Sequence, residues 1–87
     1  MFVILTYDIN ERRVNKILKI CRRYLNHIQN SVFEGEIGEK GLHSLKKEIY
    51  SVINESEDSI VLYKLQNTKF THKETIGMNK ENTSNIV

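Results

Sequence analysis

The chain opens with a continuous apolar run and continues with apolar positions at helical spacing. Residues 2–9 (FVILTYDI) are apolar on both faces of a pleated strand, which predicts a central strand covered on both sides. Asp8 falls near the C-terminal end of this strand. Asn10 predicts the cap of a helix that begins at Glu11 and ends near residues 24–26, because an Asn side chain accepts the unpaired amides of a first turn. The predicted apolar stripe of this helix consists of Val14, Ile17, Leu18, Cys21 and Leu25.

The rest of the chain alternates between extended and helical patterns. Residues 27–37 predict two short strands or one bulged strand, and residues 42–54 predict a second helix. Residues 58–65 (DSIVLYKL) alternate in the manner of a strand. A more polar strand is expected at 68–78, followed by a polar tail over 79–87. The βαββαβ order predicts an α+β fold in which both helices lie on one face of an antiparallel sheet, with a further C-terminal strand.

The size of the chain bears on its assembly. Its 87 residues predict a single domain over residues 1–78 with a small core, and a second copy of the chain is a natural way to cover more apolar surface. The single cysteine excludes an intrachain disulfide and a zinc site built from cysteines. No apolar run approaches the length of about 20 residues that spans a membrane, so we expect a cytoplasmic protein without a membrane partner.

The charges of the chain are unevenly distributed. The net charge is only +2, yet residues 11–24 hold six bases and one acid, which leaves seven bases and ten acids elsewhere. A charged helix face is usually just a solvated one. Here, however, few acids neutralise the bases, so the pattern favours contact with the phosphates of a nucleic acid or with another polyanion. The bases opposite the apolar stripe are Arg12, Lys16, Lys19 and Arg23.

Asp8 allows two interpretations. A carboxylate between a strand and a helix is most often a cap or a turn former. Alternatively it is a ligand for Mg²⁺, which binds through one or two carboxylates and keeps several waters. One Asp is too few for a firm site within one chain, but a two-fold axis would bring two Asp8 carboxylates together at a shared ion near a phosphodiester. Both interpretations stay open on the residues alone.

Other residues with reactive or aromatic side chains give weaker signals. The three histidines lack the spacing of metal ligands. Cys21 lies on the apolar stripe, which predicts a buried small hydrophobe rather than a nucleophile. Tyr7 and Phe33 have rings that stack well on bases, but both occupy positions typical of core aromatics.

Three elements together resemble a known family. The Tyr7-Asp8-Ile9 tripeptide with its following basic helix, residues 29–35 (QNSVFEG) and residues 58–63 (DSIVLY) are similar to the CRISPR-associated protein two family. The resemblance covers residues 1–78. One departure is His27, which stands where the family often has an arginine, and a histidine is only partly charged at neutral pH.

The resemblance implies both a fold and a function. It implies a ferredoxin-like fold and a homodimer whose C-terminal strand packs on the partner's sheet. This homodimer bridges two dimers of the CRISPR integrase beneath a captured DNA duplex. Members are described as Mg²⁺-dependent endonucleases that act on single-stranded RNA or double-stranded DNA. By the same resemblance, the catalytic metal ligand falls on Asp8, and the other functional positions fall on Tyr7, Arg12 or Arg13, Ser31 and Phe33.

Two other functions fit the same elements. One is a freestanding, toxin-type ribonuclease that depends on a metal and acts without an integrase. The other is a non-catalytic nucleic-acid-binding module, although the aromatic pair and glycine-rich basic strand of RNA-recognition domains are not evident.

Overall fold

A computed structural model describes residues 1–66 and 69–79, the side chains of residues 69–71 excepted. The predicted tail therefore lies almost entirely outside the described residues. The elements are β1 (Phe2–Asp8), α1 (Glu11–Arg22), β2 (Asn26–Gln29), β3 (Val32–Glu36), α2 (Glu39–Tyr50), β4 (Ser59–Gln66) and β5 (Lys69–Gly77).

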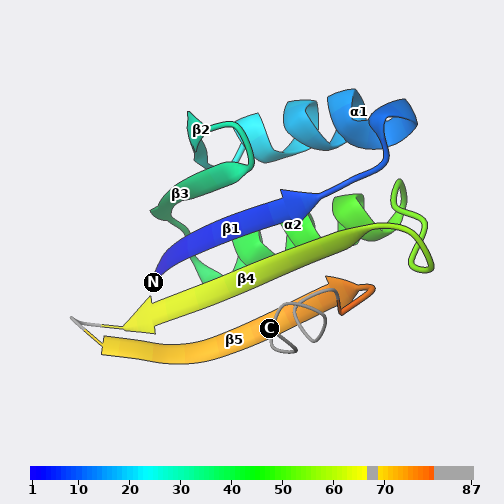
Figure 1. Ribbon diagram of the computed structural model, residues 1–87. Coiled ribbons are helices and arrows are strands. Elements are labelled where there is room, and N and C mark those ends of the chain that lie inside the picture. Colours follow the sequence, from blue (N-terminus) through cyan, green and yellow to red (C-terminus); the bar gives the residue numbers. More distant parts are fainter. Residues whose placement is uncertain (67–68, 80–87) are drawn as a thin grey trace.

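The strands form one antiparallel sheet in the order β2-β3-β1-β4-β5 (Figure 1). The first four strands confirm the predicted ferredoxin-like α+β fold, and β5 is the additional C-terminal strand. Strand β5 pairs with β4 of its own chain, from Ser59 opposite Gly77 to Gln66 opposite Lys69. The packing of this strand on a partner's sheet, which the resemblance implied, stays a prediction. Only residues 67–68 separate the two strands, and so short a connection favours a hairpin within one chain.

The core lies between the helices and one face of the sheet. Figure 1 shows α2 running behind β1 and β4. Side chains alternate between the two faces of a strand, so Val3 and Leu5 of β1 share a face with Phe33 of β3. All three are fully buried in one cluster with residues of both helices. The other fully buried apolar members of the cluster are Ile17, Cys21, Leu45, Ile49, Ile60, Leu62 and Ile76.

Within the described residues, the opposite face of the sheet carries no helix, and we call it the open face. We expected β1 to be covered on both sides, but the described chain covers only one side. The open face holds Ile4 of β1, flanked by Glu34 of β3 and Tyr63 of β4. Ile4, Glu34 and Tyr63 are only half-buried, whereas Val3, Leu5 and Phe33 on the helical side are fully buried. The other apolar side chains of the open face on β1, β3 and β4 are Phe2, Val32, Val61 and Leu65.

Both helices differ from the prediction at their ends. Helix α1 begins at Glu11 as predicted, but ends at Arg22, and its buried stripe includes Ile20, which the prediction omitted. Helix α2 covers Glu39–Tyr50 rather than residues 42–54. Gly41 was expected to precede the helix but lies inside its first turn, close to the Ile37 side chain. A glycine weakens a helix without preventing it when the apolar face packs well.

Candidate active site at the end of strand β1

Asp8 is the last residue of β1 and is exposed at the rim of the open face, opposite Ser59 of β4. It does not provide the cap of α1. That cap is Asn10, whose Oδ1 accepts the backbone amide of Arg12 at 2.9 Å. Asp8 also lines an open cleft of about 460 Å³. The other lining residues are Ile9, Asn10, Arg12, Ser56, Glu57 and Met78.

The cleft suits a hard cation only in part. Across residues 1–66 and 69–79, no group of three or more His, Cys, Asp or Glu side chains is placed to hold a metal ion. Mg²⁺ needs only one or two carboxylates, because it retains several of its waters. Two carboxylates, Asp8 and Glu57, line this cleft, and Glu57 also binds Arg13 at 2.8 Å.

A fully buried carboxylate, Asp58, lies directly before β4. Its Oδ2 accepts Arg13 Nε at 2.6 Å, and its Oδ1 accepts Arg13 Nη2 at 3.0 Å. The two oxygens also accept the backbone amides of Asn10 and Asn54, both at 2.9 Å. The Arg13 guanidinium holds the pKa of Asp58 well below its usual range, and the two amides act in the same direction.

The resemblance placed a functional basic position, expected to contact nucleic acid, on Arg12 or Arg13, and the structure holds Arg13 in an internal ion pair. Its side chain is only 18% exposed, and Nη2 also donates to Glu57 Oε1 at 2.8 Å. Hydrogen bonds to Asp58 and Glu57 raise the pKa of Arg13. Arg12 remains 71% exposed, with a long contact of 3.7 Å to Glu57. Of these two arginines, Arg12 is therefore the one available at the cleft.

The outer face of α1 presents cations to solvent, as predicted. Lys16 and Lys19 are exposed, and so is Arg22, which the prediction of binding residues omitted. Within the described part of the chain, no ion pair involves these three residues. Arg23 differs, because it forms an ion pair with Glu48 of α2 and lies 5.9 Å from the Tyr24 ring centroid.

Tyr7, Ser31 and Phe33 come together around the turn between β2 and β3. The Tyr7 hydroxyl donates to the Asn30 carbonyl, and the Tyr7 backbone amide donates to the Ser31 carbonyl at 3.1 Å. Phe33 is fully buried, with the His27 ring stacked on it at 4.4 Å between centroids. This confirms Phe33 as a core aromatic. Tyr7 and Asp8 are neighbours in sequence, but their side chains lie on opposite faces of the sheet.

Cys21 is fully buried, as predicted from its place on the apolar stripe. Burial raises the pKa of its thiol to about 12. The nucleophilic thiolate is therefore scarce at neutral pH, and Cys21 acts as a small core residue.

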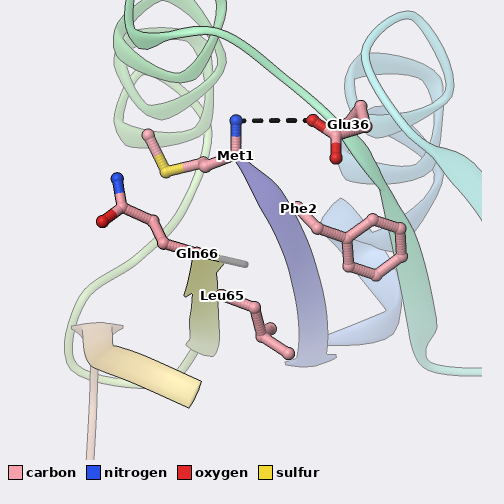
Figure 2. Close-up of a pocket in the computed structure, with 5 residues that line it drawn as sticks. All are labelled: Met1, Phe2, Glu36, Leu65 and Gln66. Carbon is pink, nitrogen blue, oxygen red and sulfur yellow. Dashed lines mark ion pairs between the residues drawn. The ribbon is translucent and has the colours of Figure 1, made fainter. Parts of the chain in front are cut away.

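A second cleft, of about 580 Å³, lies at the opposite end of β1 (Figure 2). The Met1 ammonium lies 3.4 Å from Glu36 Oε2 and donates to the Ile37 carbonyl at 3.1 Å. Phe2 and Leu65 supply its apolar lining, and Gln66 completes it. The Glu36 carboxylate of this cleft is paired with the Met1 ammonium, whereas the cleft at the other end of β1 holds the predicted site residues Asp8 and Arg12.

Sequence reasoning missed the partnership between Asp58 and Arg13, which lie 45 positions apart. The available signal was an acidic pair, Glu57-Asp58, directly before an apolar strand. We interpreted Asp58 as the first residue of that strand, where a charge is normally exposed. Nothing in the local pattern indicates its partner.

The fold and site define a small ferredoxin-like protein with an acidic strand end beside a basic helix. The family model for CRISPR-associated protein Cas2 matches residues 1–73. The chain therefore belongs to the Cas2 family, which confirms the resemblance noted in the sequence.

Individual relatives agree with this assignment. The chain is 46% identical over 87 residues to the CRISPR-associated endoribonuclease Cas2 of Dictyoglomus turgidum, covering 100% of both chains. It is 48% identical over 80 residues to the protein of the same name from Thermotoga maritima, covering 92% of each. A crystal structure of a Cas2 protein superimposes with a TM-score of 0.75 at 35% identity, covering 92% of this chain and 90% of that one.

Proposed function

We propose that two copies of this chain pair through their open faces to form the small subunit of the CRISPR spacer-acquisition machinery. In this role the dimer binds the backbone of duplex DNA and bridges integrase dimers. It also carries a Mg²⁺-dependent endonuclease site for single-stranded RNA or double-stranded DNA, with Asp8 as the metal ligand. The observation that carries the proposal is the position of Asp8 at the rim of an uncovered apolar face.

The open face supports the pairing. Phe2 and Ile4 of β1 and their partners Leu65 and Tyr63 of β4 are half-buried and form the apolar centre of this face. Contiguous apolar surface of this kind marks interaction sites in small proteins. A two-fold pairing repeats each residue across the axis. Residues near that axis meet their own copies, so an axis that passes near the Asp8 end of the face would bring two Asp8 carboxylates together at one ion.

The cleft supports the chemistry. Bound Mg²⁺ supplies stabilisation for the charge that develops on a phosphodiester and lowers the pKa of coordinated water. Asp8 holds the ion, and the exposed Arg12 guanidinium at the same cleft is suited to orient a phosphate. The relatives whose names describe them as endoribonucleases support the same activity.

The outer face of α1 supports binding to the duplex. Lys16, Lys19 and Arg22 project into solvent without acidic partners among the described residues. Such side chains neutralise phosphates and position a duplex without reading its sequence. Arg13 is not included in this surface, because Asp58 and Glu57 hold its guanidinium.

Exchanging Lys16 and Lys19 for glutamine is expected to weaken duplex binding uniformly across sequences. The slope of log affinity against log salt should become shallower by about 0.9 for each phosphate that the variant no longer neutralises. A fluorescence-anisotropy titration of a labelled duplex at several salt concentrations measures this slope.

The matched control for this experiment is the Lys40→Gln, Lys47→Gln variant, which removes two exposed lysines of α2 and makes the same change in net charge. It should keep the wild-type slope. Equally weakened binding in the two double variants would mean that overall charge, rather than the α1 face, binds the duplex.

A further inference from the structure

Asp58 joins four parts of the chain beneath the cleft that holds Asp8. Its carboxylate accepts the Asn10 amide after β1, the Arg13 side chain of α1 and the Asn54 amide of the turn after α2. Its own carbonyl accepts the Met78 amide after β5 at 2.8 Å. The backbone is tightly packed here. A Cβ added to Gly77, which has φ +85°, would lie 2.3 Å from the Asp58 carbonyl oxygen.

Burying the Asp58 carboxylate costs free energy, and this cost restricts the geometry of the groups around it. A carboxylate with no exposure to solvent is tolerated only when a counter-charge and hydrogen bonds replace its water. Asp58 receives four donated hydrogen bonds, two of them from the planar guanidinium fork of Arg13. A fork bound by both oxygens of a carboxylate fixes orientation as well as distance. The groups around Asp58 are therefore held in one arrangement.

The same arrangement fixes Asp8 from two sides. The amide bound to Asp58 belongs to Asn10, two residues after Asp8 and just beyond the end of β1. Ser59, the residue after Asp58, pairs with Asp8 across the sheet. Asp8 is exposed at a strand end, where a chain would otherwise fray.

We propose that Asp58 is a positioning residue for Asp8, and that the Asp58–Arg13 pair fixes the end of β1 so that the Asp8 carboxylate is presented to a divalent cation. This inference rests on the proposed function, in which Asp8 is the metal ligand. Asp58 itself is buried and does not touch the ion.

Two variants test this role against a matched control. Asp58→Asn turns an acceptor into an amide donor facing Arg13, and Arg13→Lys keeps the charge but removes the two-pronged contact. The control is Glu74→Gln, which breaks the ion pairs of a partly buried carboxylate with Lys46 and Lys64, at 2.6 and 3.1 Å. Comparison with this control separates positioning of Asp8 from general destabilisation.

The first measurement is amide hydrogen exchange by NMR at residues 8–10, at a temperature where every variant is folded. Exchange at Ile9 and Asn10 should rise at least about tenfold in Asp58→Asn and Arg13→Lys relative to Glu74→Gln, because the opening of a local segment then requires less free energy. If Asp58→Asn does not fold, Arg13→Lys provides the same comparison. If the variants that fold exchange the amides of Ile9 and Asn10 no faster than Glu74→Gln does, the proposal is overturned.

The second measurement is the affinity for Mn²⁺, followed by electron paramagnetic resonance. The affinity should fall about 10- to 100-fold in Asp58→Asn and Arg13→Lys, because the loss of a group that orients a metal ligand typically weakens metal binding by that factor. It should stay unchanged in Glu74→Gln. Mn²⁺ binding that Asp8→Asn does not alter would refute the metal site of the proposed function. Exchange at Ile9 and Asn10 would still decide whether Asp58 fixes the end of β1.

Discussion

Replacing Asp8 with asparagine is expected to abolish Mg²⁺-dependent cleavage of single-stranded RNA while the dimer stays intact. Asparagine has nearly the same shape, but it lacks the negative charge that a hard cation needs. The rate should fall more than about 100-fold, because loss of a group that merely orients a metal ligand already costs about 10- to 100-fold. Cleavage of a labelled RNA, with and without a chelator, measures the change in rate.

The matched control for Asp8→Asn is Glu55→Gln, which removes one negative charge from an exposed residue of the turn before β4. This variant should cleave at the wild-type rate. Wild-type cleavage by Asp8→Asn would place the chemistry elsewhere in the chain, or in a contaminating nuclease.

A lysine at Ile4 is expected to break the dimer without unfolding the chain. Ile4 lies on β1 at the centre of the open face, so its replacement leaves the core between sheet and helices untouched. Pairing of two such faces would bury two added ammonium groups, each beside the Glu34 carboxylate of the neighbouring strand, and removing an ion from water costs several kcal/mol. The dimer dissociation constant should therefore rise more than about 100-fold, since each 1.4 kcal/mol is a factor of ten. Sedimentation equilibrium measures the change.

Ser44→Lys adds the same charge on an exposed position of α2 and should leave the mass of the dimer unchanged. Circular dichroism checks that both lysine variants keep the fold. A dimer that persists in Ile4→Lys would show that the copies pair through another surface.

Local patterns predicted the elements of this fold well. The apolar run of residues 2–9 became β1, and Asn10 caps α1. Helix α2 was misplaced because Gly41 resembles a break, whereas the packing of Leu42, Leu45 and Ile49 supports a helix through it. Local propensity does not register that tertiary support.

The candidate site was less predictable, because its key interactions are long-range. The place of Asp8 at a strand end and the solvent-facing lysines of α1 followed from local patterns, and the metal-ligand role of Asp8 stays a prediction. Arg13, by contrast, has the same local pattern as Arg12, and only the fold brings Asp58 to it. The open face of β1 was also misjudged, because an apolar run is consistent with burial by the same chain or by another copy.

The central claim is that two Asp8 carboxylates share one ion across a two-fold axis, and the number of Mn²⁺ ions bound per chain tests it most directly. Electron paramagnetic resonance titration combined with the sedimentation mass should give one Mn²⁺ per two chains, with binding abolished in both Asp8→Asn and Ile4→Lys. One ion per chain, or full binding by a monomeric Ile4→Lys variant, would contradict the account.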